Sequence, residues 1–133
     1  MRIMIDTNIF VSAILYPLSD VAKIVAHIKR YHTIVICEKI IIELERVFKR
    51  KFPDKLEDMH EDLESLIDEV FEVGAVDLSK YPDIRDTKDL LILINAIESR
   101  VEIFITGDND FYDVKVTKPR IMTSRQYINE FMV

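Results

Sequence analysis

The sequence predicts an α/β protein of three layers, α/β/α, in which helices cover both faces of a central five-stranded parallel sheet. Short apolar runs alternate along the chain with longer segments whose apolar residues recur at helical spacing. Such alternation is typical of βαβ units and a parallel sheet. The run LLILI at 90–94 is apolar on every side, as expected of a helix that packs on more than one side.

The first third of the chain contains two predicted strands and two predicted helices. The run RIMID at 2–6 is a short strand that ends on a carboxylate, and a helix at 8–16 follows it. Ser19 is placed to cap a helix at 19–32, and TIVIC at 33–37 is expected to form the second strand. The apolar residues of the helix at 19–32 recur at helical spacing: Val21, Ile24, Val25 and Ile28.

The middle of the chain is expected to contain two long helices and the third strand. The first helix spans 38–52, and its apolar face is formed by Ile40, Ile41, Leu44, Val47 and Phe48. Pro53 is suited to start the second helix, at 53–73, and Gly74 to end it. The apolar side of the second helix consists of Leu56, Met59, Leu63, Leu66, Ile67 and Val70. AVDL at 75–78 is then expected to be the third strand.

The last part of the chain repeats the same alternation. DTKDLLILINAIESR at 86–100 predicts a helix, and VEIFIT at 101–106 predicts the fourth strand. GDNDFYD is expected to form a turn with one helical turn at most. PRIMT at 119–123 is a short fifth strand, and a helix at 124–132, capped by Ser124, closes the chain.

Composition limits the classes of function. The 133 residues predict a single domain, 1–133, and 49% hydrophobic with 32% charged residues indicates a globular protein. The net charge of −6 argues against bulk electrostatic binding of nucleic acid, but allows action through a bound cation or a local basic strip. Cys37, the only cysteine, is expected to pack as a small hydrophobe. No segment has a leader pattern or the roughly 20 apolar residues of a membrane span, so we expect a cytoplasmic protein without membrane contact.

Acidic residues from separate segments fall where such a sheet binds ligands. Ligands of open parallel sheets bind beyond the carboxyl ends of the strands, where the strand order reverses. Asp6 ends the first strand, and Asp108 and Asp110 follow the fourth. Glu43 lies early in the helix after the second strand, and Asp89 lies in the first turn of the helix before the fourth. Asp89 shares a helix face with apolar residues: Ile92, Leu93 and Ala96.

Each acid also has a simpler explanation. Asp86 is placed as a helix N-cap, and the helix dipole favours Asp89 in the first turn. The stretch 107–110, GDND, is a good turn sequence, and Glu43 is one of several acids of a solvated helix. Asp6 is the hardest to explain in this way, because a charge at the end of a buried strand needs a partner.

Taken together, the acids predict a cation site. Like charges that converge must take up protons or hold cations. Ligands that are all oxygen select Mg²⁺ or Mn²⁺, as one or two ions, whereas no His or Cys cluster suggests zinc. Such a site activates a water and stabilises the charge that develops on a phosphodiester. Outer residues that orient waters or phosphate oxygens are expected to be Thr7, Asn8, Ser12 and Thr106.

Four stretches of the chain resemble PIN-domain proteins when taken in order: DTNIFVSAIL, IIELERVFKRKF, RDTKDLLILINAI and ITGDNDF. The group they resemble most is the PIN-family toxin component of toxin–antitoxin pairs, similar to VapC. The resemblance implies a five-stranded parallel sheet between helices and metal-dependent endonucleolytic cleavage of RNA. It also implies a homodimer and a cognate antitoxin that inserts a segment near the acids.

The resemblance also assigns roles to the acids. The expected catalytic residues, which are also metal ligands, are Asp6, Glu43, Asp89 and Asp108, with Asp110 as a further metal ligand. One departure is Thr87, where relatives commonly have proline, which leaves the shape of that loop open. Asp86 remains an alternative or outer ligand.

Substrate contacts are less well defined in the sequence. The most basic stretch, RVFKRKFPDK, contains the candidate substrate-binding residues Lys49, Arg50 and Lys51, and KRYH at 29–32 is a second basic stretch. A solvated helix face is the favoured explanation of each stretch, and contact with RNA phosphates is the alternative. Ile42, an apolar residue outside the expected core face, suggests a subunit contact.

Three classes of function therefore remain. The leading one is a ribonuclease that depends on Mg²⁺ or Mn²⁺. The second is a non-catalytic module that binds RNA or protein, in which the acids hold a structural ion or cap helices. The third is a DNA nuclease or a phosphatase that uses the same metal chemistry, since the residues alone indicate only phosphoryl transfer.

Overall fold

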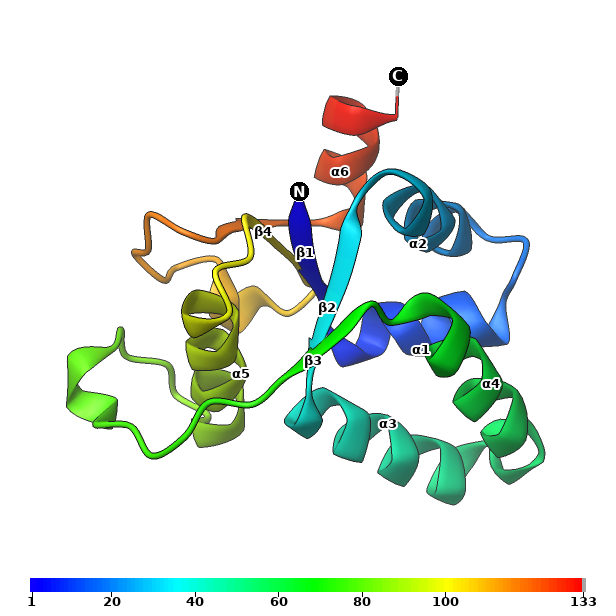
Figure 1. The fold of residues 1–133 in the computed structure, drawn as a ribbon, viewed down its shortest axis with the longest axis horizontal. Coiled ribbons are helices and arrows are strands. Elements are labelled where there is room, and N and C mark those ends of the chain that lie inside the picture. The colour runs from blue at the N-terminus through cyan, green and yellow to red at the C-terminus, as the bar shows by residue number, and fades with distance from the viewer. Residues whose placement is uncertain (133) are drawn as a thin grey trace.

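A computed structural model describes residues 1–132, and its strands form one five-stranded sheet in the order β3-β2-β1-β4-β5 (Figure 1). Every neighbouring pair of strands is parallel. The strands are β1 (Arg2–Ile5), β2 (Thr33–Cys37), β3 (Glu69–Phe71), β4 (Ile103–Ile105) and β5 (Arg120–Met122). The α-helices are α1 (Thr7–Leu15), α2 (Asp20–Tyr31), α3 (Glu38–Lys51), α4 (Leu56–Leu66), α5 (Thr87–Glu98) and α6 (Ser124–Phe131). Three short 3₁₀ helices complete the elements: η1 (Pro53–Lys55), η2 (Leu78–Lys80) and η3 (Asn109–Phe111).

Helices lie on both sides of the sheet, which confirms the predicted three-layer class. Figure 1 shows α1, α2 and α4 on one side of the central strands and α5 on the other. Helix α3 begins at the carboxyl end of β2, at the lower end of the sheet in that view. None of these helices is by itself long and apolar enough to cross a membrane, although α1 and α2, bent by 109° at their junction, pass that test of length and composition together.

The order of the strands reverses beside β1. The chain builds β2 and β3 outward on one side of β1 and then returns to build β4 and β5 on the other. The backbone N–H of Asp6 donates to the carbonyl of Ile105 at 2.9 Å, so the pairing of β1 with β4 extends to the ends of both strands. The carboxyl ends of β1 and β4 therefore meet at the switch point, where open parallel sheets bind ligands.

The core explains why these strands lie in the middle. The three central strands are apolar on both faces because helices cover both, and their side chains are almost all buried. The largest side chains that are completely buried around them are Tyr127, Phe10, Phe48, Phe104 and Phe111. Cys37 packs in this core as predicted, and burial raises the pKa of its thiol to about 11.

The prediction for residues 53–73 was wrong at its end. The helix α4 stops at Leu66, and β3 occupies Glu69–Phe71. AVDL at 75–78, the predicted third strand, lies instead in the loop before and at the start of η2, and Gly74 does not end a helix. The apolar residues Leu66, Ile67 and Val70 fit helical spacing, so the local pattern could not reveal the change of structure.

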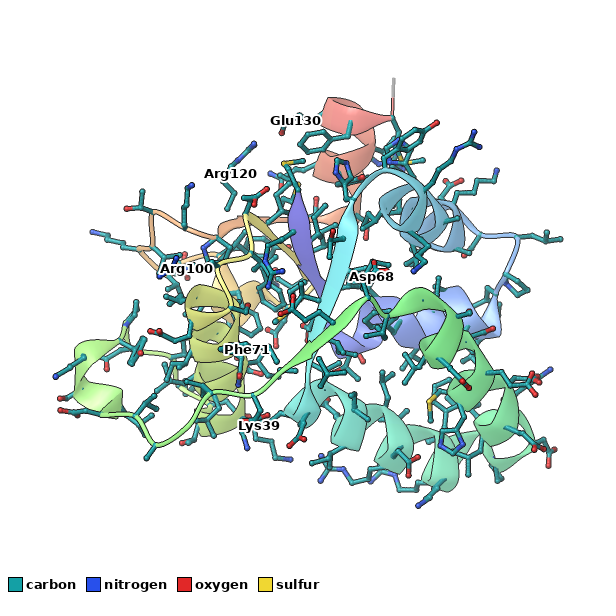
Figure 2. The ribbon with its side chains drawn as sticks, viewed as in Figure 1. Lys39, Asp68, Phe71, Arg100, Arg120 and Glu130 are labelled. Atoms are coloured by element: carbon teal, nitrogen blue, oxygen red, sulfur yellow. The ribbon has the colours of Figure 1, made fainter. Side chains whose placement is uncertain are left out.

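Contacts from outside the segment explain why the helix ends. The backbone N–H of Asp68 donates to the carbonyl of Ile34 at 3.0 Å, and the Asp68 carboxylate accepts from the N–H of Ile34 at 2.8 Å. Lys29 Nζ lies 2.7 Å from the same carboxylate, which sits at the start of β3 beside β2 (Figure 2). The hydrogen bonds from Lys29 and from the N–H of Ile34 hold the pKa of Asp68 below its usual range. The edge of β2 thus receives a partner strand that helical spacing could not predict.

Helix caps follow the sequence signals with one correction. Ser19 Oγ accepts from the N–H of Ala22 at 3.1 Å and caps α2, as predicted. For α6 the cap is Thr123 and not Ser124. Thr123 Oγ1 accepts from the N–H of Gln126, and the Gln126 side chain accepts from the N–H of Thr123. This reciprocal capping box satisfies two backbone donors, which a cap at Ser124 would not do.

Candidate active site

Asp6 stands at the centre of the switch point. Its side chain is 9% exposed and caps α1, because Oδ1 accepts from the N–H of Thr7 at 2.8 Å. Its other oxygen, Oδ2, accepts from the hydroxyl of Thr106 at 2.6 Å, at the end of β4. Burial raises the pKa of the Asp6 carboxyl, and the charges of Glu43 and Asp108 raise it further, against the two hydrogen bonds that lower it. The capping explanation and the cluster explanation are therefore both true of this residue.

Thr106 links the first acid to the two after β4. It is completely buried, and while its hydroxyl donates to Asp6 it also accepts from the N–H of Asp108 at 3.0 Å. Asp108 in turn caps η3, since its Oδ1 accepts from the N–H of Asp110 at 2.9 Å. A continuous chain of hydrogen bonds thus links the carboxylates of Asp6 and Asp108 to each other and to the backbone of Asp110.

Asp89 completes a tight group of acids. One carboxylate oxygen from each of Asp89, Asp108 and Asp110 lies within 4.8 Å of the other two. Burial raises the pKa of Asp89 to about 7, and the charges of neighbouring acids contribute: Asp108, Asp86, Asp6 and Asp110. Burial and the charges of these neighbouring acids both disfavour the ionised form of Asp89, so this carboxyl tends to hold a proton until near neutral pH.

Glu43 and Asp86 lie at the border of this group. Glu43 is half-buried on α3, close enough to Asp6 for its charge to affect the pKa of that residue. Asp86 caps α5, accepting from the N–H of Lys88 at 2.8 Å, and its charge acts on Asp89. The structure therefore brings all the predicted acids to one edge of the sheet, although their roles as ligands stay predictions.

The predicted outer residues differ in their contacts. Thr106 hydrogen-bonds directly to Asp6, and Thr7 contacts Asp6 through its backbone N–H. Thr7 Oγ1 is buried and has no hydrogen-bond partner within residues 1–132. Asn8 is exposed and Ser12 is half-buried, and neither side chain hydrogen-bonds to an acid in the described part of the chain.

A divalent cation fits this site. The donors are all carboxylate oxygens, and the buried Thr7 hydroxyl lacks a hydrogen-bond partner in the described part of the chain. Within residues 1–132 the only ion pair that reaches these acids comes from Arg85, whose Nη2 lies 3.6 Å from Asp110 Oδ2 and whose side chain is 87% exposed. An exposed pair of this kind contributes little, so it does not offset the repulsion. Hard oxygen ligands with excess charge match Mg²⁺ or Mn²⁺.

Two residues beside the acids were missed by the sequence analysis. Tyr112 donates its hydroxyl hydrogen bond to the carbonyl of Thr106. Burial, with the charges of Asp6 and Asp108, raises the pKa of this phenol. Arg85 lies two residues before α5 begins at Thr87, and nothing in the sequence distinguished it from the rest of RDTKD. Both contacts depend on loop conformations that no local pattern specifies.

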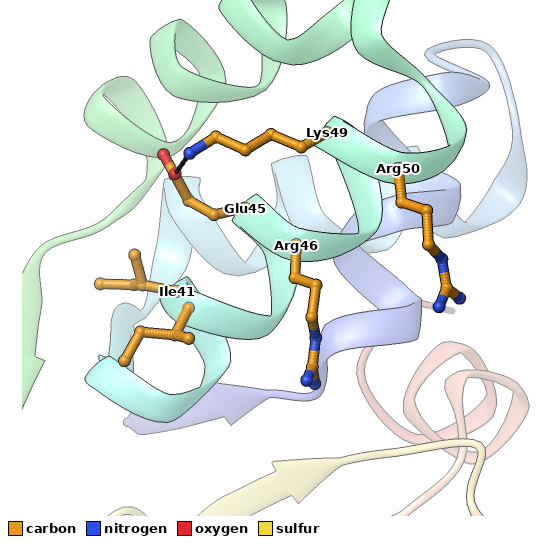
Figure 3. Close-up of a pocket in the computed structure, with 6 residues that line it drawn as sticks. Ile41, Glu45, Arg46, Lys49 and Arg50 are labelled. Atoms are coloured by element: carbon orange, nitrogen blue, oxygen red, sulfur yellow. Dashed lines mark ion pairs between the residues drawn. The ribbon is translucent and has the colours of Figure 1, made fainter.

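The basic stretch on α3 is divided between two sides of the helix. Figure 3 shows Lys49 turned toward Glu45, with Nζ 3.1 Å from Oε2, whereas Arg46 and Arg50 extend together to another side. In the second stretch Lys29 is paired with Asp68, and the Arg30 guanidinium lies over the ring of Tyr31. Ile42, the predicted subunit contact, is 63% exposed.

Comparisons with known proteins agree with this fold. The family model described as PIN domain matches residues 2–110. Seven chains of solved structures match, among them a chain in the crystal structure of VapBC2 from Rickettsia felis bound to a DNA fragment from their promoter. The similarity covers 92% of this chain and 97% of that chain, with a TM-score of 0.68 and 20% sequence identity. None of the curated proteins matches this chain.

Proposed function

The chain belongs to the PIN-domain family, whose members are nucleases, and from this premise we propose that it is a metal-dependent endoribonuclease and the toxin of a toxin–antitoxin pair. The observation that carries the proposal is the group formed by Asp89, Asp108 and Asp110, whose carboxylate oxygens lie within 4.8 Å of one another beside buried Asp6. A cluster with this much unneutralised charge, at the switch point of a parallel sheet, is suited to hold cations rather than to stabilise the fold.

The residues that would hold Mg²⁺ or Mn²⁺, as one or two ions, are Asp6, Glu43, Asp89, Asp108 and Asp110. When bound, such an ion lowers the pKa of water and stabilises the charge that develops on a phosphodiester. Thr106 favours the charged form of Asp6 by donating to Oδ2 at 2.6 Å, against the effect of burial. Thr106 also fixes the turn that carries Asp108, so one buried hydroxyl orients acids from two strands.

Water and substrate would be positioned by groups around the acids. The Thr7 hydroxyl, buried and without a hydrogen-bond partner among residues 1–132, is available to hydrogen-bond a water or a phosphate oxygen next to Asp6. Arg85, exposed and only 3.6 Å from Asp110, is able to swing from that carboxylate to a substrate phosphate. The reaction is then hydrolysis: a water oxygen attacks phosphorus, and the leaving ribose oxygen takes up a proton.

The proposals that RNA is the substrate and that an antitoxin is the partner depend on membership of the PIN-domain family. The similar chain from Rickettsia felis comes from a VapBC2 assembly bound to promoter DNA. By analogy with that assembly, this chain would pair with an antitoxin that covers the acids, and would form a homodimer. The expectation of a cytoplasmic protein, and of a single domain over 1–133, fits such a toxin.

The decisive test is the substitution Asp6→Asn. Asparagine keeps an N-cap acceptor but removes the charge, so we expect the rate of RNA cleavage to fall by about 10³-fold or more while the protein stays folded. Wild type is assayed on structured RNA, single-stranded DNA and a phosphomonoester, in Mg²⁺, Mn²⁺ and chelator. Asp20→Asn, an exposed acid in the first turn of α2, is the matched control. A folded Asp6→Asn protein that cuts RNA as fast as wild type would overturn the proposal.

A binding module without catalysis is the second candidate. It is favoured by the observation that Asp6, Asp86 and Asp108 each cap a helix, which is a structural use for every one of them. This candidate predicts that wild type binds RNA equally in Mg²⁺ and in chelator and cuts none of the three substrates. Calorimetric titration with Mn²⁺ separates the nuclease from a module whose acids only cap helices, because simple caps would take up no ion. A module that holds a structural ion would bind Mn²⁺ but still cut none of the substrates.

A further inference from the structure

A groove between α3 and α5 leads away from the acids. It is a cavity of about 160 Å³, lined by Lys39, Ile42, Glu43, Arg46, Lys88, Leu91 and Ile92. Glu43 forms part of its wall and also lies close enough to Asp6 for its charge to raise the pKa of that residue, so the groove and the acidic site share a residue. The floor is apolar, and the charged groups at its rim are cations apart from Glu43.

Three of the cations on α3 form a stripe: Lys39, Arg46 and Arg50. Lys39 and Arg46 are seven residues apart, nearly two full turns, and Arg50 follows one turn later, so all three point to the same side of the helix. Figure 3 shows the side chains of Arg46 and Arg50 extending in this common direction, and Figure 2 shows Lys39 at the start of the helix. At a rise of about 1.5 Å per residue the stripe is roughly 16 Å long. Lys88, in the first turn of α5, faces the stripe across the cavity.

These cations are not engaged by the protein's own acids. None of Lys39, Arg46, Arg50 and Lys88 makes an ion pair within residues 1–132. On the same helix Lys49 is paired with Glu45, and nearby Lys55 is paired with Asp58, whereas Lys51 makes no ion pair within residues 1–132. The four cations at and near the groove are a local exception to the chain's net charge of −6.

We propose that the α3–α5 groove, with its continuation along α3 to Arg50, binds the backbone of a single RNA strand, with Lys39, Arg46, Arg50 and Lys88 on its phosphates, and guides that strand to the acids. The inference rests on the proposed nuclease function and adds the path of the substrate to it. An extended strand fits because the cations lie in a line, and because phosphates would be repelled by most of the remaining surface. The apolar floor, Ile42, Leu91 and Ile92, offers van der Waals contact to sugars and bases.

The test measures binding apart from cleavage. A fluorescent single-stranded oligouridine is titrated with wild type, Arg46→Ala and Lys88→Ala in chelator, by anisotropy at several salt concentrations. We expect each variant to bind on the order of tenfold more weakly. The slope of log K against log salt should shrink by about 0.7 for each phosphate contact removed. The matched control is Lys23→Ala, an exposed lysine on α2, which should leave both quantities unchanged.

The outcomes separate this proposal from the nuclease proposal. If wild type binds no RNA, or if Lys23→Ala weakens binding as much as Arg46→Ala, the groove is not the path and the proposal is overturned. If the groove variants change the molecular mass in solution by light scattering but not the affinity for RNA, the surface is a protein contact, and the proposal is also overturned. If groove variants weaken binding while wild type cuts nothing in Mg²⁺ or Mn²⁺, the groove stands and the nuclease function falls. Circular dichroism and melting curves confirm that each variant is folded.

Discussion

Asp89→Asn should make the metal-free protein more stable at alkaline pH while it damages the proposed site. Asp89 has a pKa of about 7 in the folded protein, against the ordinary 3.8. Between these two values the folded state keeps a proton that the unfolded state has lost. Stability must therefore fall as the pH rises from about 4 to about 7, and the full penalty remains above pH 7.

The size of the effect follows from the shift and its environment. A shift of three pKa units would correspond to about 4 kcal/mol in a fully buried site. Because Asp89 is only half-buried, solvent screening reduces this, and we expect about 1–2 kcal/mol. An opposing contribution exists, since a negative charge in the first turn of α5 gains about 0.5 kcal/mol from the helix dipole. Burial, the largest cause of the raised pKa, acts together with the charges of Asp108, Asp86 and Asp6, and their combined effect is expected to exceed the gain from the dipole.

The assay is urea denaturation in chelator at pH 5 and pH 8. At pH 8 we expect Asp89→Asn to unfold with a free energy about 1 kcal/mol above wild type, and at pH 5 the difference should shrink. Added Mn²⁺ should then stabilise wild type more than the variant. Asp20→Asn, an acid in the first turn of α2 far from the cluster, should show no such gain. A variant that is no more stable than wild type at pH 8 would refute the assigned charge repulsion.

Two further predictions test the contacts that position the site and the sheet edge. Thr106→Val removes the hydrogen bond to Asp6 and the one from the N–H of Asp108, so the rate of RNA cleavage should fall about tenfold or more. The pH at which the rate rises should also move upward, because the charged form of Asp6 loses a hydrogen bond that favours it. A Thr106→Ser variant, which keeps the hydroxyl, should restore both; an unchanged pH profile in Thr106→Val would contradict the assignment. Asp68→Ala removes the acceptor for the N–H of Ile34 and the partner of Lys29, so urea denaturation should show a loss of stability of about 1–2 kcal/mol. Equal stability would show that β3 is held by its backbone hydrogen bonds alone.

Sequence reasoning succeeded where local signals and general topology were enough. Ser19 has its donor three residues on, and the strand at 33–37 is a short apolar run with clear ends, so both appear as predicted. The meeting of Asp6 with Asp108 needed only the rule that carboxyl ends of parallel strands share an edge. The rule holds because β4 pairs directly with β1.

Reasoning from the sequence failed where a distant partner decides the structure. The residues after Leu66 continue a helical pattern, but the open edge of β2 and the carboxylate of Asp68 select a strand there. Thr123 and Ser124 are both good caps, and only the reach of the Gln126 side chain distinguishes them. Helical spacing predicts on which side of α3 each cation lies. It does not predict that Lys49 pairs with Glu45 or that Arg46 lines a cavity beside α5, because those contacts depend on the three-dimensional structure.

The capping and charge roles of the acids are not alternatives, and their combination explains how the cluster exists at all. Repelling carboxylates would spread apart on mobile loops, but Asp6 and Asp108 are held by hydrogen bonds to backbone N–H groups of the elements they cap. Those elements are held in turn by buried β1 and β4, so the core offsets the repulsion. Asparagine retains a cap acceptor and alanine does not. At Asp6, therefore, the difference in unfolding free energy between the Asn and Ala variants measures the cap, whereas the difference in metal binding between wild type and Asn measures the charge.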